Sequence, residues 1–325
     1  MRLLIHETSY RRLETQISAH GGAVEPLIMD STGAVTLHGQ TVALEAILPD
    51  AGWANNDIFF SPSMRSFLAV LNTSPALKWV QSGAAGVDHP IFQRFLERGV
   101  QFTTSHGQAV GIAEYVIAGA FDALQQGPAR RAAQAAGRWE RIRFREVGGT
   151  HWLVIGFGAI GQGVAQRARA LGATVTGVRR SAASHADADQ MATLADLLAH
   201  IGGADIVVLC CPLTEATRRL ADAAFFGDMK PGAILINVGR GALVDEAALL
   251  AALDQGAPEH AVLDVFETEP LPTESRFWSH PRVSLTAHAS GDTAGQQPRN
   301  DATFLENLRR FLAREPLVNQ VTAAD

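Results

Sequence analysis

Residues 152–161 read WLVIGFGAIG, a short apolar run that leads into three closely spaced glycines. The run is typical of a buried parallel strand, and Val164–Leu171, followed by Gly172, indicates a helix. Gly-x-Gly-x-x-Gly between a strand and a helix is typical of a dinucleotide-binding turn, because its glycines allow a tight turn, close approach of a pyrophosphate and packing of the helix on the strand. The sequence therefore predicts that a pyrophosphate binds at this helix N-terminus, against Gly156, Gly158, Ala159, Ile160 and Gly161.

The position of the glycine turn, in the middle of the chain, indicates a second domain before it. About 150 residues precede the turn, which is enough chain for an independent core. In this part, short apolar runs alternate with helical patterns such as residues 90–98, which end at Gly99. The alternation predicts βαβ units and a small parallel sheet. We expect its strands at Leu3–His6, Asp57–Phe60, Leu77–Gln81 and Val100–Thr103.

A long apolar helix, Ala109–Leu124, separates this first part from a second predicted sheet. Helices are expected between its strands, for example at Ala195–His200 and Glu246–Leu253, and a last helix at about Asp301–Ala313 could return to the first domain. Six strands with crossovers after a glycine-rich turn predict a doubly wound nucleotide-binding domain. The strands are expected at Trp152–Ile155, Thr174–Val178, Ile206–Leu209, Ala233–Asn237, Ala261–Leu263 and Val283–Thr286.

The bulk composition is that of an ordinary globular protein, with 47% hydrophobic and 18% charged residues. A formal net charge of −6 argues against nucleic acid as a partner, which would require clustered excess Lys and Arg. One local exception is the arginine-rich segment 138–145, which we expect to be solvated or to face a second subunit. No apolar stretch approaches the length of a membrane span.

The two cysteines of the chain, Cys210 and Cys211, are adjacent. Neighbouring cysteines are poorly placed to bridge each other, and two alone do not resemble a metal-ligand cluster. We therefore expect no metal site and a reducing, cytoplasmic location.

The end of the second strand of the nucleotide-binding domain suggests which cofactor binds. NAD-binding domains carry an Asp or Glu about 20 residues past the glycines, which holds the ribose hydroxyls. Here Arg179, Arg180 and Ser181 stand at that point, without a carboxylate. A guanidinium can neutralise a 2′-phosphate, so we expect NADP to be preferred over NAD. The alternative is that both arginines merely face solvent.

Three segments further along the chain carry polar residues directly after expected strands. They are residues 234–241, 263–272 and 280–291. Ligands of open α/β sheets bind at the carboxyl ends of the strands, so these segments are candidates for the active site.

With the glycine turn, residues 210–214 and the stretch 77–88, these segments resemble the NAD(P)-dependent D-2-hydroxyacid dehydrogenase family. The resemblance implies an α/β protein in which a doubly wound Rossmann cofactor domain, residues 108–289, is inserted into a smaller flavodoxin-like substrate domain, residues 1–107 plus 290–325. It also implies a homodimer, which the long apolar helix favours too. The family's catalytic Arg, Glu and His correspond to Arg240, Glu269 and His288.

The chemistry of these residue types agrees with the resemblance. Reduction of a 2-keto acid needs a hydride at carbon and a proton for the oxygen, and a His is suited to supply the proton near neutral pH. Glu269 would orient and support His288, although Glu267 is a nearby rival, and Arg240 would hold the substrate carboxylate. Further contacts are expected as follows: to the substrate from Ala84, Ala85 and Gly86, and to the cofactor from Cys211, Pro212, Val238 and Asp264, the last facing the nicotinamide carboxamide or tuning the site.

The resemblance thus implies an NADPH-dependent reductase that converts a small 2-keto acid, with glyoxylate or hydroxypyruvate favoured, to a D-2-hydroxy acid. Two alternatives stay open: a non-catalytic cofactor-sensing protein, and a dehydrogenase for another substrate class. The chain departs from the family pattern at Ala287, where Pro is usual, and at residues 104–108, which lack the common Asn. Glu269 disfavours formate dehydrogenases, which carry Gln there, and no regulatory extension is expected after residue 325.

Overall fold

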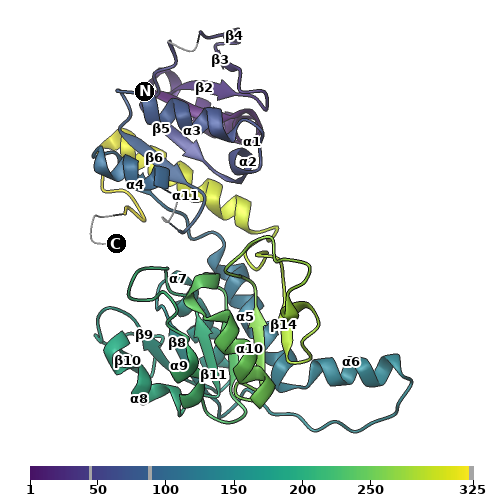
Figure 1. Cartoon of the computed structure of the whole chain (residues 1–325). Coiled ribbons are helices and arrows are strands. Elements are labelled where there is room, and N and C mark those ends of the chain that lie inside the picture. Colours follow the sequence, from purple (N-terminus) through teal and green to yellow (C-terminus); the bar gives the residue numbers. More distant parts are fainter. Residues whose placement is uncertain (44–45, 87–89, 322–325) are drawn as a thin grey trace. The chain divides into compact units, whose positions relative to one another are not determined.

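The structure is a computed structural model that describes residues 1–43, 46–86 and 90–321 (Figure 1). The chain divides into two compact units. Unit 1 comprises Met1–Gln108 and Ala294–Asp325, and unit 2 comprises Ala109–Thr293. The assignment of substrate to unit 1 and cofactor to unit 2 remains a prediction.

Unit 1 contains a seven-stranded sheet in the order β4-β3-β2-β1-β5-β6-β7. Five strands are parallel, whereas β3 and β4 run antiparallel at one edge, so the sheet is larger than predicted and is mixed. Its strands are β1 (Arg2–His6), β2 (Glu25–Met29), β3 (Val35–Leu37), β4 (Gln40–Thr41), β5 (Ala51–Ala54), β6 (Trp79–Ser82) and β7 (Gln101–Thr103).

The expected strand at Asp57–Phe60 is wrong: Asn56–Phe59 form a short helix, α2. Asp57 lies in its first turn, where a carboxylate favours a helix, and accepts hydrogen bonds from Ser9 and Arg12. The strand that pairs with β1 and β6 is instead β5, whose residues AGWA are mostly too small to give a clear strand pattern.

Helices α1 (Glu7–Ser18), α3 (Met64–Thr73), α4 (Pro90–Glu97) and α11 (Gln296–Ala313) complete unit 1 (Figure 1). The helix α11, from far along the chain, supplies part of its core. The ring of Phe304 stacks on Trp53 and Trp79, with centroid distances of 4.8 and 5.9 Å, and all three side chains are fully buried. Asn307 donates to Gln81 on β6 at 2.7 Å, also in the interior. Unit 1 is therefore complete only with α11 in place.

Unit 2 contains a parallel seven-stranded sheet in the order β10-β9-β8-β11-β12-β13-β14. This confirms the predicted α/β class with a doubly wound, Rossmann-type sheet. All six predicted strands are present, and β10 is an addition at the edge. The strands are β8 (His151–Ile155), β9 (Thr174–Val178), β10 (Gln190–Ala192), β11 (Ile206–Leu209), β12 (Ile234–Asn237), β13 (His260–Leu263) and β14 (Val283–Leu285).

Alternate residues of these strands point to two separate buried clusters, one on each face of the sheet. Trp152 and Val154 of β8 pack with residues of α5 and α7, whereas Leu153 and Ile155 pack with residues of α8, α9 and α10. Helices on both faces explain why the strands are near-continuous apolar runs. The helices are α5 (Ala109–Leu124), α6 (Gly127–Ala135), α7 (Ala159–Ala170), α8 (Leu197–Ile201), α9 (Ala223–Asp228) and α10 (Glu246–Gln255).

The arginine-rich segment that follows α6 is extended and has no helix or strand between residues 138 and 146. Figure 1 shows α6 and this segment running out from the body of unit 2. Trp139 is fully exposed and Phe144 is half exposed, and Arg130 of α6 lies 4.7 Å from the centroid of the Phe144 ring. Among the residues that the structure describes, none of the helices is long and apolar enough to cross a membrane.

Candidate active site

The glycine turn joins β8 to α7, which begins at Ala159 and so earlier than the sequence predicts. Gly156 has a φ of +102°, a value that favours glycine, and a Cβ there would overlap the backbone of Cys211. A Cβ on Gly161 would overlap the carbonyl oxygen of Gly156, whereas a Cβ on Gly158 would meet open space. Two glycines are thus required by the fold itself, and the third leaves room beside the N-terminus of α7. This cradle fits a pyrophosphate.

The residues after β11 lie against the same turn. The Cys210 thiol donates to the carbonyl oxygen of Gly156 at 3.0 Å. Burial raises the pKa of both thiols, that of Cys211 to about 11, so both stay protonated near neutral pH. Val238, after β12, is buried, and its N–H donates to the carbonyl of Leu209 at 3.0 Å. Pro212 is exposed.

Arg179 follows directly on β9 and is half-buried. Its Nε donates to the carbonyl of Ser181 at 3.1 Å, and its Nη2 donates to the carbonyl of Ala183 at 2.9 Å. The guanidinium therefore organises the loop after β9 and still has further N–H donors. Arg180 and Ser181 are exposed in the same loop. Three donor-bearing side chains at this position fit the 2′-phosphate of NADP.

The Arg240 turn follows β12 and is held by a buried side chain that sequence reasoning missed. Asn237 donates to the carbonyl of Arg240 at 3.0 Å and accepts the N–H of Gly239 at 3.1 Å. Gly241 is required, because a Cβ there would overlap the backbone of Phe266. The turn thus packs directly against the segment that leads to Glu269. The half-buried Arg240 side chain donates from Nη1 to the carbonyl of Gly239 at 2.7 Å.

His288 and Glu269 are in direct contact. The Nδ1 atom of His288 lies 2.8 Å from Oε2 of Glu269. The other carboxylate oxygen of Glu269 accepts the N–H of Phe266 at 2.9 Å, which fixes the carboxylate. Glu267, the rival candidate, lies near Arg219 instead, at 3.6 Å. His288 is the half-exposed member of the pair, with 52% of its side chain accessible.

Asp264, directly after β13, is fully buried. Its carboxylate accepts hydrogen bonds from Thr286, from the N–H of Ala289 and from both the N–H and the hydroxyl of Ser290. Its carbonyl accepts the N–H of His288 at 2.8 Å. Asp264 therefore holds the loop that carries His288. This burial gives no support to a direct contact with the nicotinamide, which remains a prediction.

The order of the strands brings the candidate residues of unit 2 to one edge of the sheet. Because all seven strands are parallel, the segments after β9, β8 and β11 lie side by side, and those after β12, β13 and β14 continue the row. The first three carry most of the expected cofactor contacts, and the last three carry Arg240, Glu269 and His288 together with Val238 and Asp264. This is the edge at which ligands of doubly wound sheets bind.

The expected substrate contacts of unit 1 lie after β6, on residues 84–86. The N–H of Ala84 is taken by the hydroxyl of Ser82 at 3.1 Å. In the described part of the chain, the N–H groups of Ala85 and Gly86 make no such bond, so these two can still act as donors. Val87 and Asp88, which belong to the same motif, lie outside the described residues.

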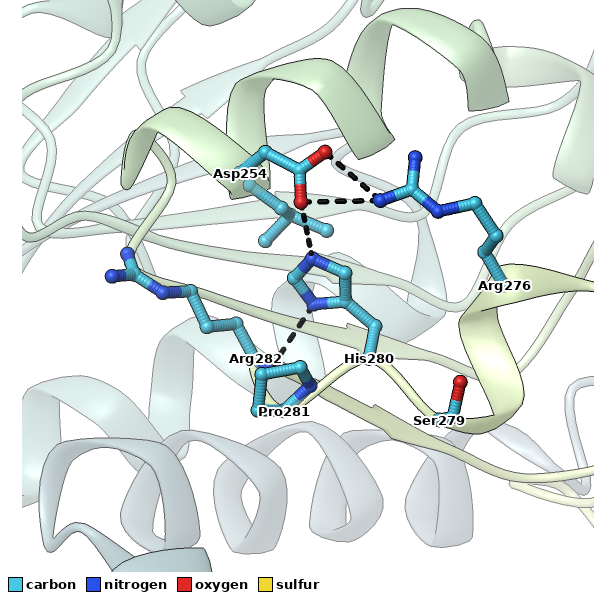
Figure 2. A pocket seen from close by; sticks show the side chains of 7 residues that line it. Asp254, Arg276, Ser279, His280, Pro281 and Arg282 are labelled. Atoms are coloured by element: carbon cyan, nitrogen blue, oxygen red, sulfur yellow. Dashed lines mark hydrogen bonds and ion pairs between the residues drawn. The ribbon is translucent and has the colours of Figure 1, made fainter.

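A pocket of about 320 Å³ lies at the opposite edge of unit 2, where β14 begins (Figure 2). Figure 2 shows Arg276 and Arg282 on opposite sides of Asp254. Asp254 accepts from Arg276 at 2.9 Å and from His280 at 3.3 Å, so its charge is already compensated within the chain. Nothing in this arrangement resembles a catalytic set. In the ranges that the structure describes, no group of three or more His, Cys, Asp or Glu side chains is placed to hold a metal.

Comparisons with known proteins show similarity to one family. The model of the family described as "D-isomer specific 2-hydroxyacid dehydrogenase, NAD binding domain" matches residues 117–290. The chain is similar to the chloroplastic D-3-phosphoglycerate dehydrogenase 2 of Arabidopsis thaliana, with 38% identity over 233 residues. This match covers 68% of the chain and 36% of the relative, so the chain spans well under half of that protein.

The solved structures that resemble the whole chain include the following two. A D-isomer specific 2-hydroxyacid dehydrogenase family protein from Aeromonas salmonicida is 31% identical, with a TM-score of 0.79 and coverage of 99% of this chain and 98% of that one. The NADPH-dependent glyoxylate/hydroxypyruvate reductase from Sinorhizobium meliloti, in complex with NADP and sulfate, is 27% identical, with a TM-score of 0.76 and coverage of 98% and 97%.

Proposed function

Because the chain belongs to the D-isomer specific 2-hydroxyacid dehydrogenase family, we propose that it reduces a small 2-keto acid to a D-2-hydroxy acid with NADPH. The observation that supports this best is the 2.8 Å contact between His288 and Glu269, at the same sheet edge as the glycine turn and the Arg240 turn. A His with a carboxylate behind it suits proton transfer to a substrate oxygen.

NADPH, when bound, supplies the hydride that forms the new bond to the keto carbon. The protein's own residues do the rest. Because Nδ1 of His288 is held by Glu269, Nε2 is the nitrogen that can give a proton to the keto oxygen. The oxygen takes this proton as the electron pair of the C=O π bond moves onto the oxygen. Glu269 stabilises the positive charge of the imidazolium before this transfer, and the neutral imidazole that is left afterwards takes a new proton from solvent. Arg240 offers N–H donors to the substrate carboxylate and to the keto oxygen, whose polarisation eases hydride addition.

The preference for NADPH rests on Arg179, Arg180 and Ser181 after β9. The reductase from Sinorhizobium meliloti, which binds NADP, supports the same cofactor. Its name also supports glyoxylate and hydroxypyruvate as the first substrates to test. The phosphoglycerate dehydrogenase relative makes a phosphorylated hydroxy acid the main competing substrate, and a cofactor-sensing protein without turnover is the second alternative.

The deciding experiment follows the loss of NADPH absorbance with glyoxylate, hydroxypyruvate, pyruvate and phenylpyruvate, repeated with NADH and with 3-phosphoglycerate plus NADP or NAD in the reverse direction. The His288→Ala variant is the control for background oxidation. We expect turnover of at least one unbranched keto acid, faster with NADPH. NADPH binding without turnover of any of these compounds would contradict the reductase and favour a sensor.

We further propose that the protein is a cytoplasmic homodimer and that the extended segment after α6 lies in the interface. Trp139 exposes its whole side chain, and Phe144 exposes half of its own, so this one segment offers two apolar rings that a second subunit would cover. Sedimentation of the wild type and of the double variant Trp139→Ser/Phe144→Ser tests this. We expect a dimer that weakens in the variant, and an unchanged monomer in both would contradict it.

A further inference from the structure

A row of hydroxyl groups leads from α5 to the carboxylate of Asp264. The hydroxyl oxygens of Tyr115 and Thr286 lie 2.8 Å apart, and the hydroxyl of Thr286 lies 2.5 Å from Oδ1 of Asp264. A carboxylate only accepts hydrogen bonds, so the single Thr286 proton points to Asp264. Tyr115 must then donate to Thr286. The row therefore has one direction, from Tyr115 through Thr286 to Asp264.

The loop that this row anchors holds His288 in an unfavourable backbone conformation. His288 has a φ of +51°, in the left-handed region that side chains other than glycine rarely adopt. Such a conformation persists only where its surroundings fix it. Here the fixing contacts are the bonds that Asp264 accepts on both sides of His288, from Thr286 before it and from Ala289 and Ser290 after it.

Taken together, these contacts point to a residue outside the expected catalytic set. We propose that Tyr115 is a positioning residue for His288: through Thr286 it orients the buried carboxylate of Asp264, which holds the 286–290 loop and thereby sets the direction of the imidazole. This inference rests on the proposed function for its catalytic meaning, although its geometric part does not.

Tyr115 is suited to this position because it stays a hydrogen-bond donor. Burial is the main cause that raises the pKa of its hydroxyl, and the nearby charge of Asp264 acts in the same direction. The phenol is therefore protonated throughout the working range of such an enzyme. A donor at the start of a hydrogen-bond chain also strengthens the bonds that follow it, most of all in a buried site.

The test uses three variants that keep the packing nearly unchanged. Tyr115→Phe removes the first donor, Thr286→Val breaks the row with a side chain of the same shape, and Thr286→Ser restores the hydroxyl. The chain's only other tyrosine, Tyr10 in unit 1, gives the matched control Tyr10→Phe. We expect kcat to fall by about ten-fold to a hundred-fold in Tyr115→Phe and Thr286→Val, because small displacements of a catalytic group are costly. KM for NADPH should be unchanged, and Thr286→Ser and Tyr10→Phe should resemble the wild type.

A second readout does not depend on turnover. In protein labelled with ¹⁵N at histidine, and assigned with His288→Asn, the ring nitrogens of His288 should change their signals in Tyr115→Phe and Thr286→Val but not in Thr286→Ser. Wild-type signals and wild-type kcat in folded Thr286→Val would overturn the inference. So would equal losses in Thr286→Ser and Thr286→Val, or a loss that only follows a lower melting temperature. If the wild type turns over none of the keto acids, the proposed function fails while the ring signals still decide the positioning role.

Discussion

His288 is held by Glu269 through one ring nitrogen only: Nδ1 lies 2.8 Å from Oε2, and no hydrogen bond to Nε2 occurs in the described part of the chain. Glu269 in turn accepts the N–H of Phe266 at 2.9 Å. One oxygen of the carboxylate is thus fixed by the backbone of Phe266, and the other oxygen fixes the imidazole at Nδ1.

Replacing His288 by Ala should lower kcat by about 10²-fold to 10⁴-fold, which is the usual contribution of a positioned acid–base group. The affinity for NADPH should change little, because the glycine turn and Arg179 lie after other strands. Single-turnover rates and NADPH fluorescence titrations measure the two quantities separately. An active His288→Ala enzyme would show that the proton comes from elsewhere.

Glu269→Gln should reduce activity most strongly at the alkaline end of the pH profile for keto-acid reduction. A neutral amide no longer stabilises the positive charge of the protonated imidazole, which is the proton donor. Glu267→Gln is the matched control, since Glu267 faces Arg219 rather than His288. Profiles of kcat against pH for the three proteins give the answer, and parallel profiles for both variants would refute the pairing.

Two glycines of the nucleotide turn should respond differently to the same substitution. Gly161→Ala should lower the melting temperature, because its Cβ would overlap the carbonyl oxygen of Gly156. Gly158→Ala should fold like the wild type, because its Cβ meets open space, and yet bind NADPH less tightly where the methyl group excludes the pyrophosphate. Thermal melts and NADPH titrations distinguish the two effects. Normal NADPH affinity in Gly158→Ala would place the pyrophosphate elsewhere.

Arg179→Ala should lower kcat/KM for NADPH by about ten-fold to a hundred-fold, because one or two charge-assisted hydrogen bonds are lost. The kcat/KM for NADH should stay nearly unchanged. Arg276→Ala serves as the control, because Arg276 pairs with Asp254 at the opposite sheet edge (Figure 2). Initial rates with both cofactors suffice. Equal losses with NADPH and NADH would mean that Arg179 acts only on the loop after β9.

The stability of unit 2 should depend on pH through Asp205. Burial alone would raise the pKa of this carboxyl, but hydrogen bonds from Lys230, at 2.6 Å, and from the N–H of His151, at 2.9 Å, outweigh it and lower the pKa. The stabilisation is therefore present at neutral pH and is lost as the pH falls through the lowered pKa. Asp205→Asn should cost about 1 kcal/mol at pH 7, a value reduced by the exposure of Lys230, and progressively less in acid. Urea unfolding at several pH values measures this, and a constant difference would contradict the ionic origin.

The parts of the fold that could be predicted are those encoded over short distances. At residues 152–161 the glycines mark where the strand ends and the helix begins, so both elements can be predicted from the local sequence. The strands of unit 2 are apolar runs because both faces of the sheet are buried. The prediction of a strand at Asp57–Phe60 was wrong. The actual strand, Ala51–Ala54, has mostly small residues, and its formation depends on its neighbours in the sheet.

The candidate site was predictable only in part, for a similar reason. Arg240, Glu269 and His288 were identified as catalytic candidates from the family resemblance, because nothing in the spacing of Glu269 and His288 shows that their side chains are in contact. Their contact depends on β13 and β14 being neighbours. Tyr115 was not identified at all, because a tyrosine in an apolar helix looks like an ordinary core residue until its hydroxyl is found beside Thr286.

The stacking of Phe304 on Trp53 and Trp79 has a consequence for biosynthesis. The ribosome makes both tryptophans first, then the whole of unit 2, and only then α11. Unit 2 is one continuous stretch of the chain and can complete its sheet once β14 has emerged. Unit 1 stays incomplete until α11 has been made, and until then Phe304 does not cover the rings of Trp53 and Trp79. The unit whose synthesis begins first is thus the last to mature, and its open tryptophan surface is what a chaperone would meet on the nascent chain.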